Sequence, residues 1–174
     1  MAATIRTFAG KRPDIGRGVF LAETCSVIGD VVIGEESSIW YGTVVRGDVM
    51  PIRIGARTSI QDNTVIHVTS DFSGTIVGDD CTVGHSAIIH ACTVEDFCLI
   101  GMGSIILDGA VIGRGSLVGA GALVTPGTDI PAGSLVIGSP ARVKRPLNER
   151  EREQLTYAAE HYVELTRRYL AESG

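Results

Sequence analysis

Aromatic side chains are scarce in this chain of 174 residues, where they make up 5% of the sequence. The apolar content is 44%, supplied largely by isoleucine and valine, and glycine occurs 22 times. A chain poor in large rings and rich in β-branched residues favours thin β-layers over a helical bundle. The length allows one core of useful size, so we expect one main domain with a terminal appendage.

Long apolar runs and basic clusters are also missing. No apolar stretch approaches the roughly 20 residues that cross a membrane, and residues 1 to 18 lack the apolar centre of a signal peptide. Acidic residues outnumber basic ones by 20 to 15, which gives a formal charge of -5. We therefore expect no membrane and no nucleic acid among the partners, and a cytoplasmic location is the simplest interpretation.

An apolar β-branched residue recurs every six positions along most of the chain. After a three-residue insertion, a loop and a one-residue deletion are allowed for, the recurring residues are Ile33, Ile39, Val45, Ile54, Ile60, Ile66, Val77, Val83, Ile89, Val94, Ile100, Ile106, Ile112, Val118, Val124, Ile130 and Val136. Four residues after each of them the side chain is nearly always small. Cys81 and Cys98 take that small position and are interpreted as core residues, whereas Cys92 does not take it.

A period of six matches neither an α-helix nor the simple alternation of a strand. Three hexapeptides per coil, with coils stacked at the strand spacing of roughly 4.8 Å, would give a three-sided prism. The pattern resembles the left-handed parallel β-helix of hexapeptide-repeat proteins. We predict an all-β domain of this kind over residues 1–146, with repeats from about residue 25 to 140.

The chain changes character after Pro146, where a helix is predicted over about residues 149 to 171. Asn148 and Glu151 have the spacing of a capping box. Apolar residues then recur at intervals of three and four, as in an amphipathic helix: Leu155, Ala158, Tyr162, Leu165 and Tyr169. Residues 147–174 are therefore predicted to form a C-terminal helix that covers a face of the prism or a neighbouring chain.

Three of the four histidines fall between positions 67 and 90. His67 and His90 follow the third inward residue of successive coils, in an outward column with Arg46, so they should lie about one strand spacing apart. His85 belongs to the preceding face, and five extended residues span up to roughly 16 Å around a corner. A neighbouring subunit could supply it, and a three-sided prism suits a trimer.

Three neutral imidazoles with one vacant position suit a catalytic Zn²⁺ or Fe²⁺, which lowers the pKa of a water molecule toward ~7. The alternative is that these are ordinary exposed histidines. The clustering of His67, His85 and His90 favours the metal site.

Three segments around these histidines resemble gamma-class carbonic anhydrases and their bacterial relatives: VVRGD (Val44 to Asp48), IQDNTVIH (Ile60 to His67) and VGHSAIIH (Val83 to His90). The resemblance implies reversible, metal-dependent hydration of carbon dioxide to bicarbonate by a homotrimer. It also implies a site between subunits, with His67 and His90 from one chain and His85 from the next.

The same resemblance implies that Arg46 and Asp48 form the interface ion pair bordering the site, with Asp62 nearby. From its place in the histidine column, Arg46 could bind an anion such as bicarbonate. Gln61 precedes His67 by six residues, and its amide could orient the metal-bound hydroxide or the product. The plainer alternatives are a surface ion pair for Arg46 and a contact between coils for Gln61.

The chain departs from this family's pattern where acidic residues shuttle protons. Val49 stands where a glutamate can follow the Arg-x-Asp segment, and the loop Val68 to Gly74 is short, with Asp71 its sole acid. Such a change should slow proton release without removing the metal. Tyr157 is a candidate for replacing part of that function, with simple packing as the alternative.

Two other functions remain open. The segment GSPAR (Gly138 to Arg142) resembles one found in hexapeptide-repeat acyltransferases, which indicates an acyltransferase or an acyl-CoA thioesterase. A trimeric metal-binding scaffold with little catalytic activity is the third hypothesis.

Overall fold

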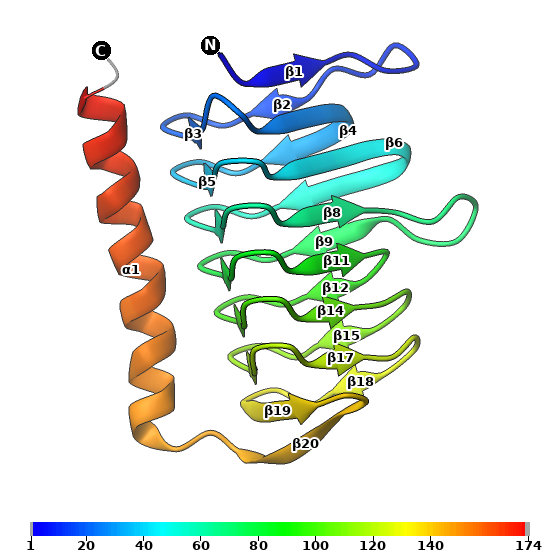
Figure 1. Ribbon diagram of the computed structural model, residues 1–174, viewed down its shortest axis with the longest axis vertical. Helices are drawn as coiled ribbons and strands as arrows, with labels where there is room; N and C mark the ends of the chain where they lie inside the picture. The colour runs from blue at the N-terminus through cyan, green and yellow to red at the C-terminus, as the bar shows by residue number, and fades with distance from the viewer. Residues whose placement is uncertain (1, 173–174) are drawn as a thin grey trace.

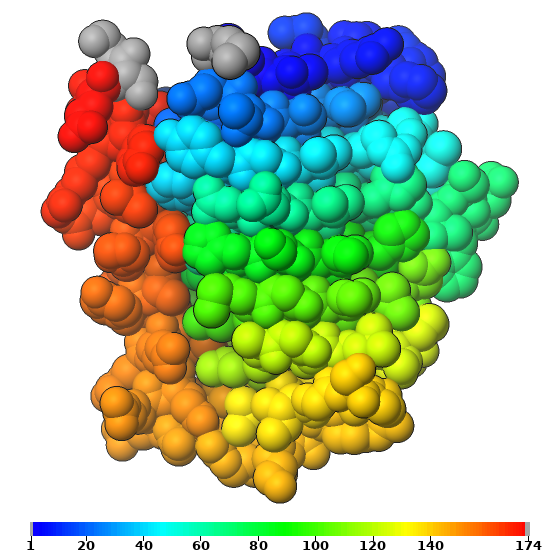
Figure 2. Space-filling view, in the orientation of Figure 1, coloured from blue at the N-terminus to red at the C-terminus, as the bar shows by residue number. Residues whose placement is uncertain are grey.

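The computed structural model, described over residues 2–172, is a parallel β-solenoid with one long helix along its side (Figure 1). Short strands wind into stacked coils, and each coil contributes one strand to each of three faces. Figure 2 shows the coils as stacked bands, with the helix at one edge of the molecule. The predicted all-β fold with a C-terminal helix is confirmed.

The first two faces form one 12-stranded sheet, because β4 and β6 run around the corner between them. The first face holds β1 (Thr4–Arg6), the start of β4 (Ser26–Ile33) and of β6 (Val44–Ile54), β8 (Val65–His67), β11 (Ile88–His90), β14 (Ile105–Ile106) and β17 (Leu123–Val124). The second holds β2 (Asp14–Ile15), the ends of β4 and β6, β9 (Thr75–Val77), β12 (Thr93–Val94), β15 (Val111–Ile112) and β18 (Asp129–Ile130).

The third face is an 8-stranded sheet that ends in an antiparallel strand. Its parallel strands are β3 (Phe20–Leu21), β5 (Ser38–Ile39), β7 (Ser59–Ile60), β10 (Thr82–Val83), β13 (Leu99–Ile100), β16 (Leu117–Val118) and β19 (Ser134–Gly138). The antiparallel strand is β20 (Ala141–Pro146), which leads into the helix α1 (Glu149–Glu172).

The core is a column of stacked aliphatic side chains inside the prism. Every recurring residue from Ile33 to Val136 is at most 3% exposed, as the six-residue period predicts. Cys81 and Cys98 are buried core residues, as predicted. Cys92 is also a core residue, and burial raises its pKa to about 12. The expectation that Cys92 lies outside the small inward position is therefore wrong, because the one-residue deletion shifts the register there.

The solenoid begins earlier than the repeat in the sequence indicates. Ile5, Ile15 and Leu21 lie in register with residues of the next coil, so the segment before residue 25 forms a further coil. Ile15 and Leu21 are six residues apart, but the ten residues from Ile5 to Ile15 break the hexapeptide period, because the chain makes an extra bend between β1 and β2. A search for equal spacing therefore misses this coil.

Helix α1 packs on the third face (Figure 1), where Phe20 and Trp40 form a small cluster with Tyr162 and Tyr169 of the helix. The ring centroids of Phe20, Trp40 and Tyr169 lie 5.0 to 5.2 Å apart, in tilted and edge-to-face arrangements. The indole N–H of Trp40 donates to the hydroxyls of Ser38 and Ser59, at 3.0 and 2.9 Å. Within residues 2–172 no helix is long and apolar enough to cross a membrane.

The helix begins at the predicted capping box. The Glu151 N–H donates to Asn148 Oδ1, and the Asn148 N–H donates to Glu151 Oε2, both at 2.9 Å. These two bonds satisfy backbone donors that the first turn leaves free. Arg145 at the end of β20 adds a two-pronged contact to the same Glu151 carboxylate.

Candidate metal centre

His67 and His90 stand side by side on the first face. They are direct partners in the pairing of β8 with β11, and their ring centroids lie 5.2 Å apart. The Nδ1 atom of His67 approaches the Nε2 atom of His90 to 3.2 Å. The predicted column of histidines on neighbouring coils is confirmed.

A carboxylate contacts the other ring nitrogen of each histidine. Asp48 Oδ1 lies 3.1 Å from His67 Nε2, and Asp108 Oδ1 lies 2.7 Å from His90 Nδ1. An ionised carboxylate can only accept hydrogen bonds, so these contacts assign the ring protons to His67 Nε2 and His90 Nδ1. The two remaining nitrogens, which face one another, then both carry lone pairs.

Two converging nitrogen lone pairs are a donor set that suits a cation such as Zn²⁺ or Fe²⁺. Carboxylates that hold the far side of metal-binding histidines are also the usual outer partners of such sites. The residues of this pair therefore fit a metal ion.

Both carboxylates are held in the ionised form. Burial raises the pKa of Asp48, but contacts with His67 and Arg46 outweigh it and the pKa is lowered. The Thr69 hydroxyl donates to Asp108 at 2.6 Å and lowers the pKa of that carboxyl, with His90 as the second cause.

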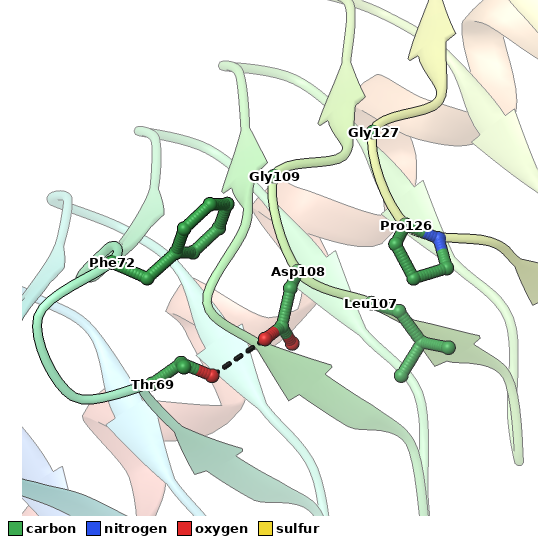
Figure 3. Close-up of a pocket in the computed structure, with 7 residues that line it drawn as sticks. All are labelled: Thr69, Phe72, Leu107, Asp108, Gly109, Pro126 and Gly127. Atoms are coloured by element: carbon green, nitrogen blue, oxygen red, sulfur yellow. Dashed lines mark hydrogen bonds between the residues drawn. The ribbon is translucent and has the colours of Figure 1, made fainter.

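Asp108 was not predicted from the sequence. Figure 3 shows its carboxylate between β14 and the loop that carries Thr69, at the edge of an apolar pocket of about 770 Å³ that also includes Phe72 and Leu107. Leu107, which immediately precedes it, continues the column of His67 and His90. The aspartate directly after Leu107 was the sequence signal that could have identified this residue.

Arg46 and Asp48 form an ion pair within one chain, on β6 directly beside His67. Asp48 thus joins the guanidinium of Arg46 to the ring of His67. Val49 follows them and is 47% exposed. The structure therefore places Arg46 and Asp48 at the histidine pair.

His85 lies elsewhere on the same chain. It follows β10 at a corner of the third face, and its Nδ1 atom lies 2.7 Å from the Asp62 carboxylate. Residues 2–172 of a single chain contain no group of three or more His, Cys, Asp or Glu side chains placed to hold a metal. The separation of His85 from the pair agrees with the sequence argument that it cannot reach the same ion within its own chain.

Gln61 lies with His85 rather than with the histidine pair. Both line a groove between α1 and the third face, together with Tyr162. Tyr157 does not line this groove: it is 67% exposed and its ring stacks on His161. The spacing in the sequence predicts Tyr162 only as part of the apolar stripe of the helix and does not indicate that it lines this groove.

Comparison with known proteins places the chain in a family. A model described as bacterial transferase hexapeptide (six repeats) matches residues 91–126. In solved structures, a hexapeptide transferase family protein from Anaplasma phagocytophilum superposes with a TM-score of 0.91 and 44% identity, covering 95% of this chain and 98% of that one.

Two curated relatives carry a more specific name. Gamma carbonic anhydrase 2, mitochondrial, from Arabidopsis thaliana is 45% identical over 98% of this chain, which spans only 63% of that protein. Carbonic anhydrase from Geobacillus kaustophilus is 49% identical over 96% of this chain and 91% of its own length. On this identity and coverage, the chain belongs to the gamma carbonic anhydrase family.

Proposed function

We propose that this chain catalyses the reversible hydration of carbon dioxide to bicarbonate in a homotrimer. His67 and His90 of one subunit and His85 of the next would share each metal ion. The observation that carries the proposal is the His67–His90 pair, whose free nitrogens converge at 3.2 Å while carboxylates hold their other nitrogens. The names of the relatives support the choice of reaction.

The surface beside the pair supports a shared site. Val44, Val65, Ile88 and Ile105 lie in register on the outer side of the first face. Val65 and Ile88 are 39% and 36% exposed. Each lies two residues before a histidine of the pair, and therefore on the same outer side of the strand. Exposed aliphatic residues in a continuous row are typical of a surface that another subunit covers.

The ion we propose is Zn²⁺ or Fe²⁺, because imidazole nitrogen suits both metals. When bound, it would lower the pKa of a water molecule so that the oxygen can add to carbon dioxide near neutral pH. His67, His90 and His85 would hold it.

The surrounding residues would act on the substrate and the proton. The guanidinium of Arg46 carries the positive charge that a bicarbonate anion requires, and Asp48 fixes its position. Gln61, on the side of His85, would orient an oxygen of the product through its amide. The role predicted for Tyr157 in proton release remains a prediction, and so does a cytoplasmic location.

The test is stopped-flow hydration of carbon dioxide by protein of measured metal content, before and after anaerobic loading with Zn²⁺ or Fe²⁺. We expect activity that rises with metal content. The matched variant His90→Ala should lose metal and activity together. His161→Ala is the control, since that histidine is exposed on α1.

A fully metallated protein that does not hydrate carbon dioxide would contradict the proposal. The acyltransferase or thioesterase alternative and the metal-binding scaffold would then be distinguished by assaying acyl-CoA hydrolysis and transfer on the same sample.

A further inference from the structure

The groove between α1 and the third face is produced by a row of glycines. Gly84, Gly101 and Gly119 each follow the inward residue of successive coils, and each donates its N–H to the next coil. A Cβ on Gly101 would lie 2.4 Å from the Ala120 backbone nitrogen, and one on Gly84 would lie 2.7 Å from that of Met102. Close stacking of the coils thus requires glycine, and it leaves a floor without side chains.

The helix supplies the opposite wall with a matching period. Gln154, Ala158 and Tyr162 are four residues apart, so they form one stripe about 12 Å long on α1. The three glycines span two coil spacings, roughly 10 Å. Between the two rows lies a hollow of about 420 Å³ whose sides are apolar, with Leu99, Met102 and Leu117 among them.

One end of the hollow is polar. Thr82 is 5% exposed, and its hydroxyl has no hydrogen-bond partner within residues 2–172. A turn about χ1 exchanges the hydroxyl with the methyl group, so the hydroxyl can face the hollow. Gln61, equally buried, and Tyr162 line the same groove and offer an amide and a phenol.

The groove of the metal-free chain disfavours an anionic ligand. Its lining, all within residues 2–172, includes no lysine or arginine. His85 is the one basic side chain in that lining, and it is paired with Asp62. Unless the proposed metal ion is bound beside it, burying a carboxylate or phosphate there would cost more than the hydroxyl and amide return.

We propose that this groove binds a neutral, elongated small molecule, with an unbranched aliphatic tail over the glycine row and an amide or alcohol head at Thr82 and Gln61. The roughly 10 Å length fits a tail of about six carbons with its head. The unpartnered hydroxyl gains a hydrogen bond on binding, and the tail displaces water from the apolar walls.

The first experiment titrates hexanamide into the full-length protein, followed by calorimetry and by the methyl NMR signals of Met102 and Leu117. Saturable binding with shifts at these methyl groups is expected. Hexanoate, with the same tail and a charged head, should bind at least tenfold more weakly to the chelator-treated protein, in which no metal ion can hold its carboxylate. No saturation by hexanamide, or equal binding of hexanoate, would overturn the proposal.

Two variants and one control variant locate the site. Ala158→Leu fills the groove and should abolish binding, whereas Ala171→Leu adds the same side chain at an exposed position of α1 and should leave it unchanged. Thr82→Val removes the head-group contact and should weaken binding about threefold to tenfold. Equal affinity in Ala158→Leu and the parent protein would show that the ligand binds elsewhere.

The measurement does not depend on catalysis. Gln61 and His85 belong to the proposed metal centre, so the head of the ligand would lie beside it. Binding is therefore measured with and without a chelator, and hexanamide should bind in both states. If Ala158→Leu proves unfolded by circular dichroism, intermolecular NOEs from hexanamide to Leu117 in the parent protein decide the question, and their absence contradicts the proposal.

Discussion

At the scale of single residues, Asp108 is the most informative side chain near the histidine pair. Its two oxygens bind His90 Nδ1 at 2.7 Å and the Thr69 hydroxyl at 2.6 Å, so they fix both the ring and its tautomer. We expect Asp108→Asn to lower metal affinity about tenfold to a hundredfold, because the amide holds the ring less firmly. Competition with a chelator measures the change.

Asp129→Asn is the matched control for Asp108, since Asp129 is exposed on β18, and its metal affinity should equal that of the parent protein. An unchanged affinity in Asp108→Asn would show that the carboxylate does not support the metal site.

The sequence predicted the histidine column but not this support. His67 and His90 follow from the period of the repeat alone, because alternation and coil length decide where they point. Asp108 is 18 residues from His90 and 39 from Thr69, and only the stacking of coils brings the three together. The placement of Tyr162 rather than Tyr157 in the groove likewise depends on how α1 is rotated against the third face.

At the scale of elements, the start of α1 depends on pH through Glu151. Contacts with Arg145 and with the Asn148 N–H lower the pKa of Glu151 from 4.5 to about 2. A carboxyl with a lowered pKa stabilises the folded state above pH 4.5, and this contribution declines as the pH falls toward 2. We expect Glu151→Gln to unfold at lower urea concentration than the parent protein at pH 7, with a smaller difference at pH 3.

Glu153→Gln serves as the control for this pH dependence, since Glu153 is exposed in the same turn region. Its unfolding midpoint should follow that of the parent protein at both pH values. A gap between Glu151→Gln and the parent protein that stays constant with pH would contradict the role given to the carboxylate.

The glycine row offers a second test of an element. Gly101→Ala places a Cβ 2.4 Å from the Ala120 nitrogen, so the two coils must separate. We expect a loss of about 1–3 kcal/mol in the free energy of unfolding, measured with urea. The neighbouring change Met102→Ala, at a largely exposed side chain, should stay within about 0.5 kcal/mol. Equal effects of the two changes would show that the coils tolerate a side chain at this position.

The two ends of the fold show why some elements could be predicted and others not. The start of α1 follows from a local signal, the capping box, which requires only four residues. The first coil carries no equal spacing, and its strands form because β4 and β5 offer them a template. Pairing with β4 and β5 replaces the missing period, and the spacing of residues within the first coil does not reveal that pairing.

At the scale of the whole molecule, the division of the three histidines between two faces would couple assembly to metal binding in the proposed trimer. His67 and His90 share the first face, while His85 lies at a corner of the third. A ring in which the first face of each subunit meets that corner of the next would complete three identical sites. Each site would then depend on two chains, and neither chain alone would hold the metal tightly.

Mixed trimers test this arrangement directly. Chains carrying His85→Ala keep the His67–His90 pair, and chains carrying His90→Ala keep His85. Neither variant alone should bind metal, but random trimers of the two, co-expressed with different tags, should hold about a quarter of the normal metal content. That fraction arises because each site needs one intact pair beside one intact His85, and each occurs with a chance of about one half. Metal content that stays at the background of the single variants would show that the three histidines do not meet across subunits.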